Sequence, residues 1–427
     1  MGLKNILMKT KAVRIYGKQD LRLEEFELPG LKEDEILAQV ISDSLCMSSH
    51  KAALQGAEHK RVPNDIHINP TILGHEFAGI ILEVGKKWQY KFKPGQKFSI
   101  QPAMNHMGTL EAPGYSYRFI GGDATHIIIP DIVMEADCLL PYDGKAFYPA
   151  SLSEPMSCIV GAFHATYHVP PGTYVHEMGI KKGSNLAILA GVGPMGLGAI
   201  DYALHQERKP SLVVVTDIDD NRLARAACLF PPEHAEKEGI KLFYLNTGKI
   251  NNPVTQIREL TGGKGYDDVF VFAPVKQVVE QGDSILGFGG CLNFFAGPTN
   301  PDFRAEFNFY NVHYAFTHIV GTSGGNTDDM RESLKLMEEG RINPSVMITH
   351  IGGLDAVVDT TLNLPRIAGG KKLIYTNISM PLVSLYGLEE KGKNDPFYAD
   401  LHKIVAGNDY IWCLEAEKYL LEYGKPI

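Results

Sequence analysis

Residues 186–196 read LAILAGVGPMG, an apolar run followed directly by a Gly-X-Gly-X-X-Gly motif. Residues 197–204 after it have a helical pattern, and Asp217 stands about 20 residues beyond the motif, at the end of a second apolar run. Such a glycine motif alone is common in loops. A strand before it, a helix after it and an acidic residue at this spacing together predict a βαβ unit that binds a dinucleotide.

Five residues of this turn, Gly191, Gly193, Pro194, Met195 and Gly196, are predicted to lie against the pyrophosphate of the cofactor. The first glycine permits the tight turn, the second lets the backbone approach the pyrophosphate, and the third allows close helix packing. The N-terminus of the following helix adds positive potential. A flavodoxin-like turn without a bound cofactor is the structural alternative.

Asp217 bears on which dinucleotide binds. Its carboxylate would accept hydrogen bonds from the ribose hydroxyls and repel a 2′-phosphate, which favours NAD(H). Arg222 lies close by in sequence and could bind such a phosphate, so NADP(H) stays an alternative. The nicotinamide end is expected near Ala273 and Phe295, because open parallel sheets bind ligands at the carboxyl ends of their strands.

The sequence on either side of this turn divides into regions of different pattern. From about residue 185 to 322, apolar strands alternate with helical stretches, which predicts an α/β fold with the doubly wound parallel sheet of the Rossmann type. Upstream, residues 12–140 are short β-prone runs between turn clusters, which predicts an all-β region. Downstream, Thr327-Asp328-Asp329 predicts a helix start and Gly340 its end.

Length and composition exclude several classes of protein. The 427 residues correspond to two or three domains, and the net charge of −9 opposes broad binding to nucleic acid or anionic membranes. No apolar run approaches the ~20 residues of a membrane span, and residues 1–9 lack a signal-peptide pattern. The six cysteines are widely scattered, so we expect reduced thiols and a cytoplasmic protein.

Four residues offer zinc-binding side chains: Cys46, the neighbours His75 and Glu76, and Glu154 at the join with the nucleotide-binding part. Singly, each has a structural interpretation, such as a buried thiol or an ion pair. A catalytic zinc takes three such ligands and keeps a fourth position open. Cys46, His75 and Glu154 meet that requirement, with Glu76 as an exchangeable fourth ligand or a neighbour of the metal. Since no further cysteine stands between Cys46 and Cys138, we expect one catalytic zinc and no structural zinc.

Together these residues resemble the zinc-dependent medium-chain dehydrogenase/reductase family. The resemblance extends to further short motifs at 83–85 (EVG), 93–95 (KPG), 121–124 (GGDA) and 349–350 (TH). Glutamate at position 154 is similar to the sorbitol dehydrogenase branch. Longer segments, 287–297, 308–314, 321–330 and 349–354, resemble L-sorbose-1-phosphate reductases. The resemblance implies a GroES-like β-barrel catalytic domain at 1–160, a Rossmann domain at 161–323, and a return to the catalytic domain with C-terminal helices at 324–427.

The resemblance also implies an activity and a quaternary structure. The expected reaction is hydride transfer between NAD(P)(H) and a sugar phosphate, with L-sorbose 1-phosphate and D-glucitol 6-phosphate as the substrate pair. Zinc would polarise the substrate oxygen, while Ser48, followed by His50 or Lys51, would move the proton to solvent. Glu76 is a further candidate catalytic residue, and a homodimer or homotetramer is expected.

Departures from the family pattern leave alternatives open. Ser49 stands where the family usually has an aspartate that orients the zinc-bound histidine, so we expect a weaker hydrogen bond there. A substrate phosphate would need cations, which His59-Lys60-Arg61 could supply, although a solvated charge run is the simpler interpretation. Another secondary alcohol, such as an unphosphorylated polyol or threonine, is an alternative substrate. A nucleotide-binding sensor without catalysis is a third hypothesis.

Overall fold

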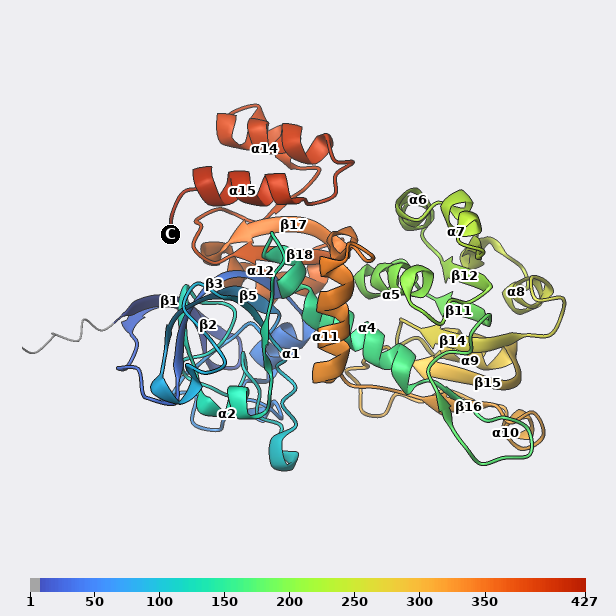
Figure 1. The fold of residues 1–427 in the computed structure, drawn as a ribbon. Coiled ribbons are helices and arrows are strands. Elements are labelled where there is room, and N and C mark those ends of the chain that lie inside the picture. Colours follow the sequence, from blue (N-terminus) through green and yellow to red (C-terminus); the bar gives the residue numbers. More distant parts are fainter. Residues whose placement is uncertain (1–7) are drawn as a thin grey trace, which may run out of the picture. The chain divides into compact units, whose positions relative to one another are not determined.

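The computed structural model describes residues 8–427 and divides into two compact units (Figure 1). Unit 1 runs to Glu154 and includes Asn326–Glu338 and Ile348–Ile427, whereas unit 2 contains Pro155–Gly325 and Glu339–Met347. The functional boundaries at 160 and 323 stay a prediction, because compactness does not say which residues serve which function. The interpretation of residues 1–9 falls almost entirely outside the described residues.

Unit 2 is built on a six-stranded sheet in the order β13-β12-β11-β14-β15-β16, with every neighbouring pair parallel. Its strands are β11 (Asn185–Leu189), β12 (Leu212–Asp217), β13 (Lys241–Asn246), β14 (Tyr266–Val271), β15 (Leu286–Phe294) and β16 (His318–Val320). The connecting helices are α5 (Pro194–His205), α6 (Asp220–Leu229), α7 (Pro232–Lys237), α8 (Pro253–Glu259), α9 (Lys276–Ile285) and α10 (Phe309–Tyr314). A two-stranded sheet, β9 (Tyr167–His168) and β10 (Glu177–Met178), completes the strands of the unit. This strand order confirms the predicted Rossmann fold.

Burial explains which strands the sequence pattern reveals. The last four residues of β11 and the first five of β12 are buried, as expected for strands covered on both faces of a parallel sheet. Strand β13 was not predicted. It lies at the edge of the sheet and most of its residues are partly or fully exposed, so it lacks a continuous apolar run.

Unit 1 contains an eight-stranded sheet in the order β19-β17-β18-β3-β5-β6-β8, with β7 also paired to β3, and a three-stranded sheet in the order β2-β1-β4. The strands are β1 (Lys9–Gly17), β2 (Asp20–Glu27), β3 (Ile36–Leu45), β4 (Thr71–Ile72), β5 (Phe77–Val84), β6 (Lys97–Ile100), β7 (His126–Ile129), β8 (Leu139–Pro141), β17 (Ile348–Gly353), β18 (Lys371–Tyr375) and β19 (Val383–Ser384). In Figure 1 the orange strands β17 and β18 therefore share a sheet with the blue strand β3. The C-terminal part of the chain thus completes the sheet that its N-terminal part begins.

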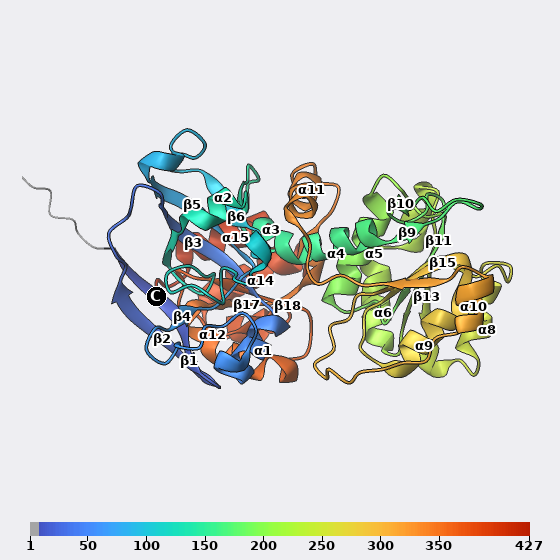
Figure 2. The ribbon, with the colours of Figure 1, turned by 90° about the horizontal axis from the view of Figure 1, so that it is seen from below.

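The helices of unit 1 are α1 (Met47–Gln55), α2 (Asp131–Glu135), α3 (Tyr148–Ser151), α11 (Thr327–Glu338), α12 (Val357–Asn363), α13 (Leu388–Gly392), α14 (Pro396–Ala406) and α15 (Leu414–Tyr423), and α4 (Ser153–Ala165) begins there. Helices α2 and α1 correct the prediction of an all-β region over 12–140, and Figure 2 shows α1 beside α12. Only four of the nine residues of α1 are buried, so its apolar pattern is short. No helix of residues 8–427 has both the length and the hydropathy that a membrane crossing requires.

Candidate active site

The pairing of three strands brings the predicted metal ligands together. Cys46 follows directly after β3, His75 and Glu76 directly precede β5, and Lys371 begins β18. Strand β3 is antiparallel to both β5 and β18, so the end of β3 lies beside the starts of the other two. These four side chains consequently meet at one edge of the sheet.

The donor atoms of three of these residues form a close group. Cys46 Sγ, a ring nitrogen of His75 and a carboxylate oxygen of Glu76 all lie within 4.8 Å of one another. Burial lowers the pKa of His75, which keeps its imidazole in the neutral form that binds metals. A thiol, an imidazole and a carboxylate are the donors that zinc prefers, so the residues present fit this metal.

Glu154 does not belong to this close group of donor atoms, but the charges of the group's residues shift its pKa. Burial, followed by the charge of Glu76, raises the pKa of Glu154 to about 7. The same two causes raise the pKa of the Cys46 thiol. The Cys46 thiol therefore stays protonated at neutral pH, and Glu154 holds its proton below about pH 7; a divalent cation would displace these protons.

Lys371 is the partner of Glu76 that sequence analysis missed. Its Nζ lies 2.5 and 2.6 Å from the two carboxylate oxygens of Glu76, and the side chains are only 7% and 1% exposed. This ion pair engages the same oxygens that a metal would use. Lys371 and a metal ion would therefore compete for the Glu76 carboxylate, and the predicted role of Glu76 at the metal stays a prediction.

Two serines of α1 contact the ring of His75 from different sides. Ser49 Oγ lies 3.2 Å from Nδ1, which confirms the expected hydrogen bond at the position of the usual aspartate. Ser48 Oγ lies 3.2 Å from Nε2 and donates a hydrogen bond to Cys46 Sγ at 3.0 Å. Because Ser48 Oγ contacts both Nε2 and Cys46 Sγ, Nε2 is the ring nitrogen on the side of Cys46 and the one that would bind a metal, while Ser49 orients the ring through Nδ1.

The two candidates for completing a proton path lie on the same helix as Ser48. His50 is buried, and its Nδ1 donates a hydrogen bond to the carbonyl oxygen of Thr361 at 2.8 Å. Lys51 is half-buried. Their predicted roles stay predictions.

Tyr115 is a second residue that sequence analysis missed. Its hydroxyl lies 3.3 Å from His75 Nε2, and the two ring centroids are 4.8 Å apart. Gly114 directly before it has φ +79° and packs so closely that a Cβ would lie 2.0 Å from the carbonyl oxygen of Gly74. No local sequence pattern predicts the contact between Tyr115 and His75, because it forms only where the loop containing Gly114 and Tyr115 packs against the residues before β5.

Unit 2 contains a cavity of about 810 Å³ beside the glycine turn. Four of the predicted cofactor residues, Gly193, Asp217, Arg222 and Ala273, line it. The predicted Phe295 does not line this cavity; its ring lies 4.7 Å from that of Phe272, which does. The cavity lies beside β11 and β14, where the strand order reverses and such sheets bind nucleotides.

The three glycines of the turn have different surroundings. A Cβ at Gly191 would lie 2.5 Å from Ile188 Cγ2, and one at Gly196 would lie 2.2 Å from the carbonyl oxygen of Gly191. A Cβ at Gly193 would meet nothing within 4 Å. Thus Gly191 and Gly196 serve packing, whereas Gly193 has open space beside it and directly precedes the partly exposed Pro194 and Met195 at the start of α5. A pyrophosphate bound at this helix N-terminus would lie beside Gly193.

The acidic residue of the cavity is partly engaged. Asp217 Oδ1 accepts hydrogen bonds from the backbone N–H groups of Ile218 at 2.8 Å and Asp219 at 3.2 Å. Its other oxygen, Oδ2, accepts no hydrogen bond from the described residues. Arg222 is half-exposed and lies 3.8 Å from the carboxylate of Asp219. One oxygen of Asp217 is therefore available to ribose hydroxyls, and Arg222 is only weakly held.

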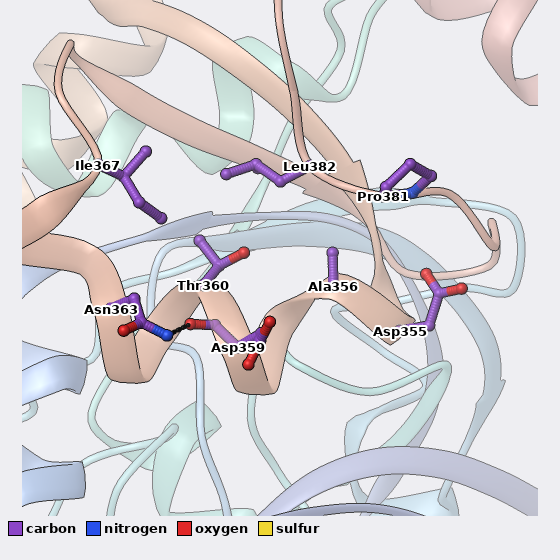
Figure 3. A pocket seen from close by; sticks show the side chains of 8 residues that line it. All are labelled: Asp355, Ala356, Asp359, Thr360, Asn363, Ile367, Pro381 and Leu382. Atoms are coloured by element: carbon purple, nitrogen blue, oxygen red, sulfur yellow. Dashed lines mark hydrogen bonds between the residues drawn. The ribbon is translucent and has the colours of Figure 1, made fainter.

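A second cavity, of about 570 Å³, lies in unit 1 between α12 and the segment before β19 (Figure 3). Asp355, Asp359 and Asn363 line one side, and Pro381 and Leu382 line the other. Asp355 already accepts hydrogen bonds from Ser379 Oγ and the backbone N–H of Met380. None of the predicted site residues lines this cavity.

Family comparisons agree with this architecture. The family model of the alcohol dehydrogenase GroES-like domain matches residues 32–135, and that of the zinc-binding dehydrogenases matches residues 194–339. The chain belongs to the zinc-binding dehydrogenase family, and the predicted combination of a GroES-like and a Rossmann domain is confirmed. It is accordingly a zinc-dependent oxidoreductase of the alcohol and polyol dehydrogenase class.

Individual relatives are similar over almost their whole length. The chain is 53% identical to mannitol-1-phosphate 5-dehydrogenase of Aliivibrio fischeri, covering 98% of both chains. It is 49% identical to L-sorbose 1-phosphate reductase of Klebsiella pneumoniae, covering 99% of both. Among solved structures, 2R,3R-butanediol dehydrogenase of Bacillus subtilis has the same fold, with a TM-score of 0.68, 20% identity, and coverage of 86% of this chain and 100% of that one.

Proposed function

We propose that this enzyme transfers a hydride between NAD(H) and a ketose or hexitol phosphate, with L-sorbose 1-phosphate and D-glucitol 6-phosphate as the first pair to test. The observation that carries this proposal is the similarity, near 50% over the whole length, to two enzymes whose names specify sugar-phosphate substrates. In this reading residues 1–160 and 324–427 supply the catalytic domain, and 161–323 bind the dinucleotide.

The metal site supports a zinc-assisted reaction. We assign Cys46, His75 and Glu154 as the ligands. Cys46 and His75 belong to the close donor group, and the pKa of Glu154 responds to both of them. Glu76, the third member of that group, is paired with Lys371. Zinc bound there would supply a Lewis acid for the oxygen of the carbinol or carbonyl carbon. The Ser48 hydroxyl, next to Cys46 and His75, both donates and accepts hydrogen bonds, which suits it to pass a proton to or from the substrate oxygen. His50 or Lys51 would continue the path.

The cavity of unit 2 supports NAD(H) as the hydride carrier. The Asp217 carboxylate would accept hydrogen bonds from the ribose and repel a 2′-phosphate. Replacing it in Asp217→Ser should raise the kcat/KM ratio of NADPH to NADH at least tenfold. Because Arg222 also lines the cavity, Arg222→Gln is the companion variant that should abolish that gain.

We further propose a homo-oligomer that works in the cytoplasm. Strand β16 is the exposed edge of the six-stranded sheet, and exposed apolar side chains gather on it, on α10 and on neighbouring segments: Phe288, Phe309, Tyr310, Tyr314, Phe316 and Ile319. A second copy would cover such an edge. Light scattering of wild type and Phe316→Glu tests it, with a smaller particle expected for the variant.

The activity test is NADH oxidation by the zinc-loaded protein with L-sorbose 1-phosphate, fructose 6-phosphate and unphosphorylated L-sorbose. Turnover of a phosphorylated ketose that disappears in Cys46→Ser supports the proposal. Turnover of unphosphorylated sugars or other secondary alcohols alone would instead favour a general polyol dehydrogenase. Binding of NADH and zinc without turnover of any alcohol would favour a sensor.

A further inference from the structure

The structure distinguishes two clusters of basic residues on unit 1 by their partners. In one cluster, Lys87 pairs with Asp131 and Glu135, and Lys91 pairs with Asp137. In the other, the His59-Lys60-Arg61 segment after α1, neither Lys60 nor Arg61 forms an ion pair with any described residue. Arg61 is nevertheless half-buried. A half-buried guanidinium without a carboxylate partner is unusual, because its charge is only partly hydrated there.

This second cluster lies beside the metal site. The Arg61 guanidinium carbon is 5.8 Å from the ring centroid of Tyr115, and the His59 ring stacks on the same ring at 5.6 Å with an interplanar angle of 12°. The Tyr115 hydroxyl in turn is 3.3 Å from His75 Nε2. A single aromatic ring therefore contacts both the basic segment and the nitrogen that we assign to the metal.

The backbone of the segment is fixed, so the position of Arg61 is defined. Ser116 Oγ donates a hydrogen bond to the carbonyl oxygen of Arg61 at 2.7 Å. The backbone N–H of Arg61 donates to His59 Nδ1 at 3.3 Å. That bond requires an unprotonated Nδ1, so the neutral ring carries its proton on Nε2 and presents a further donor.

The pKa of His59 reports the positive charges beside it. Burial, and then the positive charges of Arg61 and Lys60, lower the pKa of His59 to about 4, with His75 and Lys51 acting in the same direction. An anion placed here would gain from the charges of Arg61 and Lys60, and a planar guanidinium can bind two oxygens of a phosphate at once.

We propose that Arg61, supported by Lys60 and the His59 ring, binds the phosphate group of the substrate and so selects phosphorylated over unphosphorylated sugars. This inference rests on the proposed function and assigns its specificity to named residues. It explains why a half-buried arginine without a carboxylate partner lies next to the ring that contacts His75. Tyr115 holds the cluster in place and carries no charge itself, because burial keeps the pKa of its hydroxyl well above the usual value.

The test compares Arg61→Gln and Arg61→Lys with the matched control Lys91→Gln, which removes a charge from the other basic cluster. In the zinc-loaded enzyme, Arg61→Gln should lower kcat/KM for the phosphorylated ketose about 10- to 150-fold, the loss typical of charge-assisted hydrogen bonds. Turnover of unphosphorylated L-sorbose, NADH binding and the melting temperature should stay as in wild type. Arg61→Lys should fall between the two, and Lys91→Gln should match wild type.

Inorganic phosphate provides a second readout, because it should inhibit the wild type competitively against the sugar phosphate and inhibit Arg61→Gln much more weakly. If the wild type turns over a phosphorylated ketose and Arg61→Gln does so equally well, the phosphate assignment is overturned while the proposed function stands. If the wild type turns over no phosphorylated sugar at all, the proposed function fails and the assignment falls with it. An equal loss for phosphorylated and unphosphorylated sugars would also overturn the assignment, since it would indicate a general defect of the site.

Discussion

Lys371→Met should leave the buried Glu76 carboxylate without its counter-charge. The ammonium contacts both carboxylate oxygens, at 2.5 and 2.6 Å, and neither side chain is more than 7% exposed. Removing one partner of such a pair typically costs ~3–5 kcal/mol, because the remaining charge stays buried and uncompensated. The zinc-free protein should therefore lose about that much free energy of unfolding in unit 1.

Tryptophan fluorescence can follow this unit selectively. The only two tryptophans, Trp88 and Trp412, both belong to unit 1, so urea unfolding monitored by their emission reports its stability. Lys371→Met, Glu76→Gln and the double variant, measured after chelator treatment, form a double-mutant cycle. The double variant should be more stable than Lys371→Met alone. A loss below about 1 kcal/mol for Lys371→Met, or strictly additive effects, would refute the reasoning.

Zinc binding gives an independent check of the same ion pair. Without Lys371 the Glu76 carboxylate no longer has a competing cation, so zinc should bind Lys371→Met more tightly than wild type. Saturating zinc should accordingly reduce the stability deficit of the variant. Competition with a chromophoric chelator measures the affinity. An unchanged or weaker affinity would show that Glu76 does not approach the metal.

Three further predictions concern other parts of the molecule. Zinc affinity should fall between pH 8 and pH 6, by up to about tenfold per pH unit for each proton displaced. The reason is that the raised pKa values of Cys46 and Glu154 keep both groups protonated at the lower pH. Calorimetry in buffers of different ionisation enthalpy counts the released protons, and zinc binding without proton release would contradict the expectation. Glu417→Gln should destabilise unit 1 by about 1–3 kcal/mol. The buried carboxylate of Glu417 accepts hydrogen bonds from the backbone N–H groups of Phe147 and Tyr148 and from the Tyr375 hydroxyl. An unchanged urea midpoint for the variant would argue against this role. Gly193→Ala should leave the melting temperature unchanged and weaken NADH binding. Gly196→Ala should lower the melting temperature, because only its added Cβ would overlap the backbone of Gly191. Equal melting temperatures for the two variants would contradict this distinction.

Part of the site could be predicted because its signals are local. The glycine turn, Asp217 and the neighbours His75 and Glu76 each stand next to a strand whose apolar run is visible in the sequence. Sequence analysis did not predict the edge strand β13 or the short helix α1, since their partly exposed residues have weak apolar patterns. Similarly, no sequence motif in the loop around Tyr115 indicates that its ring contacts His75.

The sequence by itself determined the chemistry that this protein offers: a glycine-rich turn between a strand and a helix, an acidic residue at the end of the next strand, and thiol, imidazole and carboxylate side chains that zinc can bind. Tertiary structure alone decided which charges meet. Lys371 is 295 positions from Glu76, and they touch because β3 pairs with β5 on one side and β18 on the other. Turn geometry and apolar periodicity act over a few neighbouring residues, whereas an ion pair depends on the register of strands from distant parts of the chain.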